Sequence, residues 1–155
     1  MKRLTKRFII SSLCDLSLSK PIRYERYYIN DTLRVQKKDS LYQKEILDNN
    51  NNVIDKINIS KKEFVELSKQ AYSKIIRDSY LCLDDKRISI KKYLDKYEGL
   101  FRVEIVFNSI EEMNNYVKEN WMGDEITNSP LAFDKYLSKL SKEEFNKELK
   151  KFLSK

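Results

Sequence analysis

Runs of alternating apolar and polar residues fill the first two thirds of this sequence, and this period of two constrains its fold more than any other feature. Successive side chains of a β-strand point to opposite faces of a sheet, so the alternation predicts strands. The predicted strands are at about residues 4–13, 22–29, 32–37, 41–47, 53–59, 75–84, 87–94 and 100–107. Short separators rich in Asn, Asp and Lys lie between most of them, which favours antiparallel neighbours.

Helices are predicted between and after these strands, because helix-start signals occur there. Capping boxes begin at Ser60, Ser109 and Ser141, and Ser129-Pro130 places a proline in a first helical turn. In the first of these helices, apolar residues keep a helical period from Phe64 as far as Ile75. The chain of 155 residues is therefore predicted to be one α+β domain, 1–155, in which the sheet comes first and helices gather at the C-terminal end.

Two arrangements of the sheet fit the alternation. Strand 100–107 shows the pattern clearly, since Val103 and Ile105 alternate with Arg102 and Glu104. In an open sheet, helices would cover the apolar face and water would cover the charged face. In a closed barrel, which leaves no exposed edge, the apolar face would turn outward onto helices and the charges would line a tunnel. The alternation alone favours the open sheet.

The composition excludes several chemistries and favours anionic partners. His is absent, which excludes imidazole bases, Ser-His-Asp triads and His-ligated metals. Lys and Arg number 31 against 24 Asp and Glu, and a net charge of +7 suits phosphates, nucleotides, nucleic acid or acidic lipid. Cys14 and Cys82 fit no metal or redox spacing and are predicted to be free thiols. The longest clean apolar run, Phe8 to Ile10, is too short for a membrane span, so we predict a cytoplasmic protein without membrane partners.

One segment, FRVEIVFNSIEEMNNYVKENWMGDEIT from Phe101 to Thr127, resembles the C-terminal signature of the CYTH, or triphosphate tunnel, family. That signature is a V-E-V-E-F strand, a short helix and a W-x-G-x-E-V-T turn. Here the strand is residues 103–107 and the turn is residues 121–127. The segments LRVQ, from Leu33 to Gln36, and RDSY, from Arg77 to Tyr80, resemble other strands of the family more weakly.

This resemblance implies a closed eight-stranded antiparallel β-barrel, a tunnel, with flanking and C-terminal helices. Members of the family bind the triphosphate groups of nucleotides, thiamine or inorganic polyphosphate, and typical members hydrolyse or cyclise them with a divalent metal. The phosphate-binding residues that it implies here are Arg7, Arg34, Lys56, Arg77, Lys91 and Arg102, with Arg3 on the same lining. Guanidinium and ammonium groups are suited to phosphate oxygens.

The sequence departs from the family at the positions of the metal-binding carboxylates. The family begins with an E-x-E-x-K strand, and the two Glu positions are Arg3 and Thr5 in this chain. In the middle strand Ile54 and Lys56 stand at the Glu positions, and Lys91 stands where the family has a carboxylate. A lining of this kind attracts an anion and repels a free cation.

Glu104 and Glu125 remain as the candidate metal or ligand carboxylates. An ion pair of Glu104 with Arg34 or Arg77 is an equal alternative for the first. For Glu125, bracing of the turn at Gly123 is favoured over contact with a ligand. Trp121 is predicted to pack in the core beside that turn.

We therefore predict a CYTH-like protein that binds a triphosphate or polyphosphate anion in a basic tunnel and whose hydrolytic activity is weak or lost, as in a pseudoenzyme. The first alternative is an active metal-dependent triphosphatase with Mg²⁺ or Mn²⁺ as cofactor. In it, a register shift of one residue would bring Glu25, Glu45 or Asp55 inward.

A second alternative is a module that binds nucleic acid or protein through its outer basic surface. Tyr24, Tyr27 and Tyr28 lie beside Arg23 and Arg26, and aromatic and basic residues together can form a platform for single-stranded nucleic acid. Ordinary strand tyrosines on a half-buried sheet are the favoured explanation of this cluster. The sequence specifies neither the ligand nor the oligomeric state.

Overall fold

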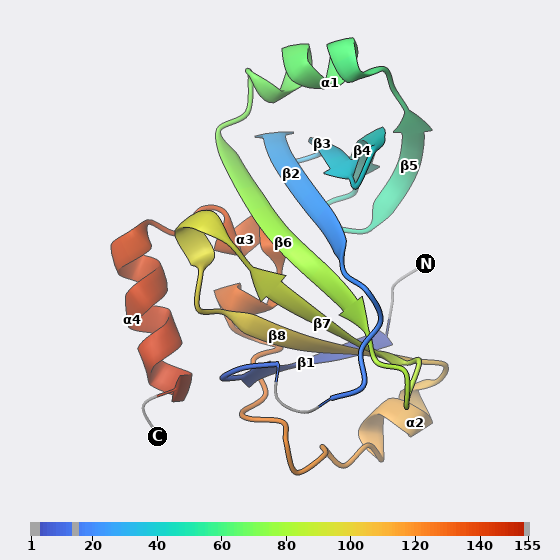
Figure 1. The fold of residues 1–155 in the computed structure, drawn as a ribbon, viewed down its shortest axis with the longest axis vertical. Coiled ribbons are helices and arrows are strands. Elements are labelled where there is room, and N and C mark those ends of the chain that lie inside the picture. The colour runs from blue at the N-terminus through green and yellow to red at the C-terminus, as the bar shows by residue number, and fades with distance from the viewer. Residues whose placement is uncertain (1–3, 14–15, 154–155) are drawn as a thin grey trace.

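The computed structural model describes residues 4–13 and 16–153 and contains an eight-stranded antiparallel sheet with helices at its margins (Figure 1). The strands are β1 (Leu4–Ile10), β2 (Ile22–Asn30), β3 (Leu33–Lys38), β4 (Leu41–Leu47), β5 (Val53–Asn58), β6 (Ser73–Leu81), β7 (Ile88–Tyr93) and β8 (Phe101–Phe107). The helices are α1 (Lys61–Ser68), α2 (Ile110–Asn114), α3 (Asp134–Leu137) and α4 (Lys142–Leu153), with short 3₁₀ helices η1 (Asp95–Tyr97) and η2 (Pro130–Ala132). The predicted α+β class and all eight predicted strands are confirmed.

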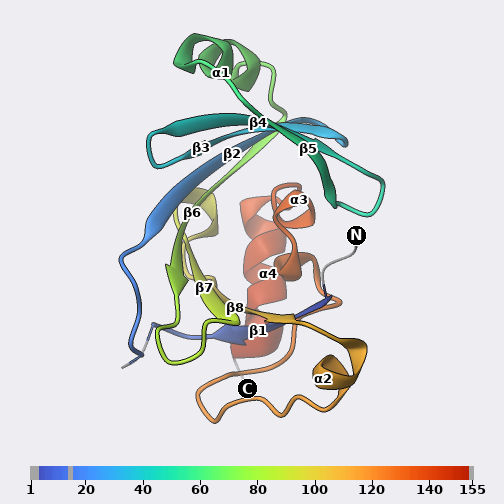
Figure 2. The ribbon, with the colours of Figure 1, turned by 90° about the vertical axis from the view of Figure 1, so that its right-hand side faces the viewer.

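The sheet is strongly curled but its two ends are not joined. The hydrogen-bonded order is β1-β8-β7-β6-β2-β3-β4-β5, so β1 and β5 are the end strands. Figure 2 shows β3, β4 and β5 on one side of α3, and β1 and β8 on the other. Within the described residues, β1 does not pair with β5, so hydrogen bonding does not confirm the predicted closed barrel.

The free edge of β1 is covered by the segment that contains the WMGDEIT turn. Ile9 donates its backbone N–H to the carbonyl of Asp124 (3.0 Å) and accepts from the N–H of Gly123 (2.8 Å). Arg7 accepts in the same way from Ile126 (2.8 Å). The segment therefore occupies the place of a ninth strand along part of β1 and satisfies an edge that would otherwise be open to another chain.

The helix starts agree with the sequence better than the helix ends do. Ser60 accepts a hydrogen bond from the backbone of Glu63 at 3.1 Å, as the capping box predicts. The helix nevertheless ends at Ser68, and Ile75 lies in β6, so the prediction of one apolar face through Ile75 was wrong. The side chain of Ile75 is buried in the sheet and not by a helix. An apolar residue at this position fits the helical period as well as the strand period, so the pattern did not distinguish the two.

The two C-terminal start signals behave differently. At Ser141 both bonds of the capping box form, since Glu144 donates to the Ser141 hydroxyl (3.0 Å) and accepts from the Ser141 N–H (2.9 Å). Ser129 caps only a single 3₁₀ turn, and the chain is extended at Phe133 before α3 begins. The single helix predicted after Ser129 is therefore divided, which places the first residue of α3, Asp134, inside the curl of the sheet.

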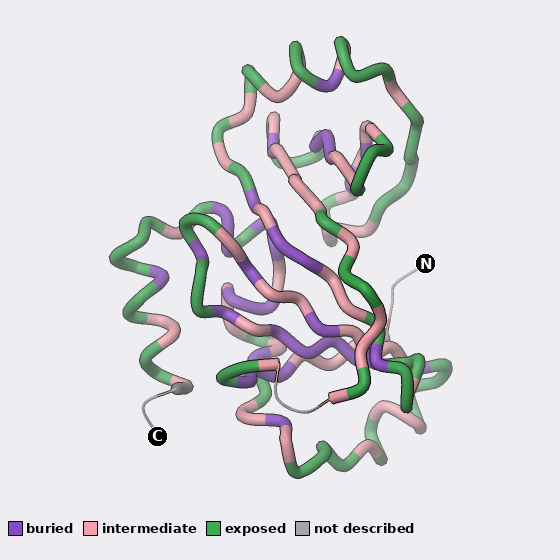
Figure 3. Tube along the Cα trace, viewed as in Figure 1, coloured by how far each residue is buried: buried purple, intermediate pink, exposed green. Residues whose placement is uncertain are grey.

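Two apolar clusters pack on opposite faces of the sheet. The outer cluster includes Val103, Ile105 and Met122, and Trp121 packs against it as a partly buried residue at the margin of the core. Cys82 is a buried free thiol in this cluster, and Cys14 lies outside the described residues. The inner cluster joins strands to η2, α3 and α4. Buried residues gather along β6, β7 and β8, whereas β5 is exposed along its length (Figure 3).

None of the helices formed by residues 4–13 and 16–153 combines the length and the apolar character that crossing a bilayer requires.

Candidate anion-binding site

A cavity of about 1080 Å³ lies on the inner face of the curled sheet, and every strand contributes to its lining. Side chains from separate strands converge here because alternate residues of each strand point to the same face. The cationic lining residues are Arg7, Arg26, Arg34, Lys38, Lys56, Arg77, Lys91, Arg102 and Lys135. Two carboxylates, Glu104 and Asp134, face them in the described part of the lining, so the cavity has a large excess of positive charge.

The six predicted phosphate-binding residues all line this cavity. They are Arg7, Arg34, Lys56, Arg77, Lys91 and Arg102. On β8, Arg102 and Glu104 face the cavity while Val103 and Ile105 face the outer cluster, so the charged face of the sheet is turned away from bulk water. This is the charges-inward alternative of the two arrangements. Arg3 lies outside the described residues.

Glu125 is the predicted ligand residue that the structure places elsewhere. It forms a bridge with Phe8, and its exposed carboxylate accepts a hydrogen bond from the hydroxyl of Thr127 at 2.7 Å. The Thr127 hydroxyl in turn accepts from the backbone N–H of Arg7 at 3.1 Å. Glu125 thus braces the covering segment on the edge of β1, which agrees with the favoured structural role.

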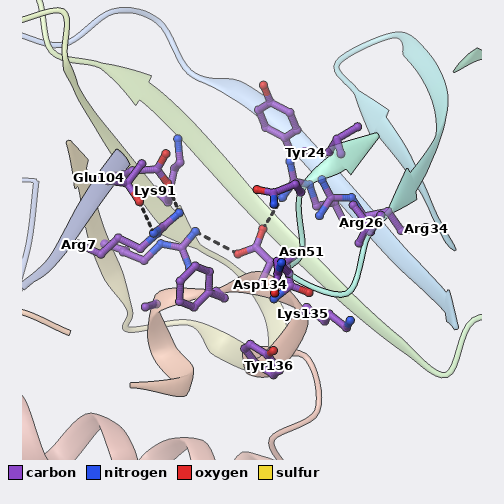
Figure 4. Close-up of a pocket in the computed structure, with 18 of the residues that line it drawn as sticks. Arg7, Tyr24, Arg26, Arg34, Asn51, Lys91, Glu104, Asp134, Lys135 and Tyr136 are labelled. Atoms are coloured by element: carbon purple, nitrogen blue, oxygen red, sulfur yellow. Dashed lines mark hydrogen bonds and ion pairs between the residues drawn. The ribbon is translucent and has the colours of Figure 1, made fainter. Parts of the chain in front are cut away.

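Asp134 is the centre of the most extensive ionic network in the cavity, which is drawn in Figure 4. Its Oδ2 atom accepts from Arg26 Nη1 at 2.9 Å and from Arg77 Nε at 3.0 Å. Its Oδ1 atom accepts from Arg102 Nη2 at 3.2 Å and from the Tyr93 hydroxyl. Burial opposes its ionisation, but the three guanidinium groups outweigh burial and hold the pKa of Asp134 well below its usual value. A fully ionised carboxylate therefore fixes three arginines from β2, β6 and β8.

Glu45 plays a similar part at the other side of the cavity. Its buried carboxylate lies 2.9 Å from Arg34 Nε and 3.3 Å from Lys56 Nζ. Burial would raise the pKa of Glu45, yet Arg34 and Arg26 bring it below the usual value. Glu45 was named among the carboxylates that a register shift could bring inward, and it does point inward. Asp55, another of them, is exposed on β5.

Arg7 and Glu104 form an ion pair on the neighbouring strands β1 and β8, with 3.3 Å between Nη2 and Oε2. The predicted partners of Glu104 were Arg34 and Arg77, but these side chains bind Glu45 and Asp134 instead. Arg7 is nearer because it is directly opposite Glu104 in the antiparallel register. Its guanidinium also stacks on the ring of Phe133, 4.4 Å from the centroid.

Two buried guanidinium groups in the cavity have unsatisfied donors. The Nε atoms of Arg7 and Arg102 are buried and have no hydrogen-bond partner among the described residues. Buried N–H groups are nearly always paired in proteins, so an acceptor from outside the chain is expected near these atoms.

Lys91 projects from β7 into the same part of the cavity and donates to the hydroxyl of Ser89 at 2.9 Å. Burial, followed by the charge of Arg77, lowers the pKa of Lys91 to about 7, and Glu104 opposes the shift. The ammonium group therefore gains or loses its proton close to neutral pH.

Sequence reasoning missed Asp134 and Arg26 as site residues. The alternation of strand 22–29 gave a signal for Arg26, because it places Arg26 on the same face as Tyr24, and both line the cavity. Tyr28 is fully buried, and Tyr27 packs against Phe64 of α1. The three tyrosines thus do not form one exposed platform. No local pattern indicated Asp134, whose place depends on the path of the chain after η2.

The fold and the site together define an α+β protein in which a curled antiparallel sheet surrounds a basic cavity. Proteins of known structure with the same fold can be compared with it. No protein-family model matches the sequence, and no curated protein matches it. The fold is similar to the crystal structure of the inorganic triphosphatase NE1496, with a TM-score of 0.72 and 17% identity over 89% of this chain and 95% of that one. A crystal structure described as the hypothetical protein NE1496 gives a TM-score of 0.74 and 17% identity, over 90% of this chain and 99% of that one. The chain thus shares its overall fold with a solved inorganic triphosphatase over most of its length.

Proposed function

We propose that this protein binds a triphosphate- or polyphosphate-type anion in the basic cavity and hydrolyses it weakly or not at all. The observation that supports this most directly is the convergence of cationic side chains from seven strands, β1, β2, β3, β5, β6, β7 and β8, on one cavity. The unsatisfied Nε donors of Arg7 and Arg102 point to an anionic acceptor. The fold is also similar to that of an inorganic triphosphatase. A triphosphate anion carries the negative charge that this basic cavity suits.

The ligand class can be a nucleotide, thiamine triphosphate or inorganic tripolyphosphate. All three present several phosphate oxygens that guanidinium groups bind through paired hydrogen bonds. Weak activity is proposed because a metal-dependent reaction needs carboxylates that hold the metal. Asp134, Glu45 and Glu104 are each paired with an arginine of the cavity instead.

Isothermal titration of the protein with ATP, thiamine triphosphate and tripolyphosphate tests the proposal. Arg7→Met should weaken binding by roughly 10- to 100-fold, because hydrogen bonds to charged groups contribute about 1.5–3 kcal/mol. Lys61→Met is the matched control, since it removes one positive charge from an exposed position at the start of α1, outside the cavity lining. Absence of binding by the wild type, or an equal effect of both substitutions, would contradict the proposal.

A second candidate is an active metal-dependent triphosphatase, and the similarity to an inorganic triphosphatase favours it. Glu104 is the carboxylate that would take part, since it lines the cavity beside Arg7. Phosphate release from tripolyphosphate with Mg²⁺ or Mn²⁺, abolished by Glu104→Gln, would support this candidate over the first. Absence of release with either metal would exclude this candidate, and release that Glu104→Gln leaves unchanged would exclude the role of Glu104.

A further inference from the structure

The carboxylates of the cavity do not form a site that suits a divalent metal. Mg²⁺ binds oxygen ligands in octahedral geometry. In proteins these are usually one or two carboxylates together with substrate phosphates and water. No group of three or more His, Cys, Asp or Glu residues is placed to hold a metal ion in residues 4–13 and 16–153. Asp134 accepts from three arginines and a tyrosine, which leaves it little capacity for a metal.

Glu104 is the remaining candidate ligand, and protein cations surround it. Arg7 Nη2 lies 3.3 Å from the carboxylate of Glu104, and the negative charge of Glu104 also acts on Lys91. In Figure 4, Arg7, Lys91 and Glu104 are grouped on one side of Asp134. A divalent cation that approached Glu104 would meet the positive charges of Arg7 and Arg102, with Lys91 adding to them when it is protonated. Like charges that are brought this close together in a buried site repel one another strongly.

These contacts suggest that protein cations perform the task that a metal performs in metal-dependent sites. A bound metal bridges a carboxylate and the phosphate oxygens and neutralises part of the phosphate charge. Here Arg7 bridges from Glu104 toward the cavity with an unsatisfied Nε donor, and Lys91 offers an ammonium group on the adjacent wall. The excess of cationic side chains over carboxylates in the described lining matches an anion that keeps its full charge.

We infer that the cavity binds its phosphate ligand as the metal-free anion, with Arg7 and Lys91 supplying beside Glu104 the positive charge that a divalent ion would supply in a metal-dependent site. This inference rests on the proposed function and specifies the form of the ligand. It predicts that Mg²⁺ competes with the protein for the ligand, because the magnesium complex of tripolyphosphate has two fewer negative charges than the free anion.

Calorimetric titration with sodium tripolyphosphate, in EDTA and then in excess MgCl₂, tests the inference. Binding is expected in EDTA, and Mg²⁺ should weaken it by at least about tenfold because each lost charge removes an attraction to several cations. Binding that requires Mg²⁺, or becomes tighter with it, would overturn the inference while leaving the proposed function intact. Absence of binding under both conditions would overturn the proposed function and this inference together.

Two substitutions of Lys91 sharpen the test. Lys91→Asp replaces an ammonium group with a carboxylate near Glu104, and should lose binding in EDTA but regain part of it with Mg²⁺. Lys91→Gln removes the charge without adding a carboxylate, and should weaken binding in EDTA with no recovery in Mg²⁺. Circular dichroism checks that each variant folds. If Lys91→Asp does not fold, the wild type and Lys91→Gln still decide, since recovery of Lys91→Gln by Mg²⁺ would contradict the assigned role of Lys91.

Discussion

Asp134 shows how one residue can organise a site of like charges. Three guanidinium groups would repel one another in the buried cavity, and the carboxylate of Asp134 compensates them through contacts of 2.9–3.2 Å. Removal of one partner from a buried ion pair leaves an uncompensated charge, which costs about 3–5 kcal/mol of stability. Asp134 therefore stabilises the empty protein and occupies a position that a ligand phosphate could otherwise approach.

Asp134→Asn should lower the free energy of unfolding by about 3 kcal/mol, as measured by urea denaturation. Tripolyphosphate should then stabilise this variant more than it stabilises the wild type, because the anion supplies the missing negative charge. The control is Asp95→Asn, which removes an exposed partner of Lys74 and should change stability by about 1 kcal/mol or less. A variant at Asp134 that is as stable as the wild type would refute the compensating role.

The sequence predicted the inward placement of six cationic side chains but not that of Asp134. Arg7, Arg34, Lys56, Arg77, Lys91 and Arg102 lie on strands, where the period of two and the resemblance specified the inward face. Asp134 lies on a four-residue helix after a 3₁₀ turn, and its approach to β2, β6 and β8 depends on tertiary packing. Local patterns do not encode such a contact, nor the pairing of Glu104 with Arg7.

At the scale of the elements, the covering segment on β1 depends on a close backbone approach at Gly123. A Cβ atom added there would lie 2.5 Å from the carbonyl oxygen of Ile9, the same atom that accepts the N–H of Gly123. Only glycine permits this contact without a shift of one of the two segments. This explains why the turn beside Trp121 contains one of the two glycines of the chain.

Gly123→Ala is accordingly expected to destabilise the protein by about 1–3 kcal/mol, the usual cost of overpacking. Chemical denaturation followed by circular dichroism measures the change. Val117→Ala, in the same connection but 82% exposed, is the control and should stay within about 0.5 kcal/mol of the wild type. Equal stabilities of Gly123→Ala and the wild type would mean that the segment does not depend on this approach.

The elements themselves were predictable to different degrees. Strands were predicted correctly because alternation over six to nine residues is a strong signal, and the capping serines marked helix starts. Helix ends were not predictable, as Ile75 shows, since an apolar residue can continue a helical face or begin a strand. Closure of the sheet also lies beyond local patterns, because it depends on which segment reaches the free edge of β1.

At the scale of the whole molecule, part of the net charge of +7 lies in the cavity. An anion bound there stabilises the protonated form of a nearby titratable group, so the protein should change its proton content when the anion binds. Lys91 is the group that responds. The charged groups that act on it are Arg26 of β2, Arg77 of β6, Arg102 and Glu104 of β8. In the empty cavity burial and these arginines hold the pKa of Lys91 at about 7, and a polyanion would raise it again.

Anion binding should therefore take up a proton above about pH 7, and affinity should fall with rising pH by up to about tenfold per unit until the pKa of the complex is passed. The sign follows because the complex binds more protons than the free protein in that window. Calorimetry of tripolyphosphate binding in two buffers of different ionisation enthalpy counts the protons. Lys91→Arg keeps the charge without titrating, and the protonation of the ligand itself is common to both proteins. The wild type should take up more protons than this variant above pH 7, and equal uptake would show that Lys91 is not the responding group.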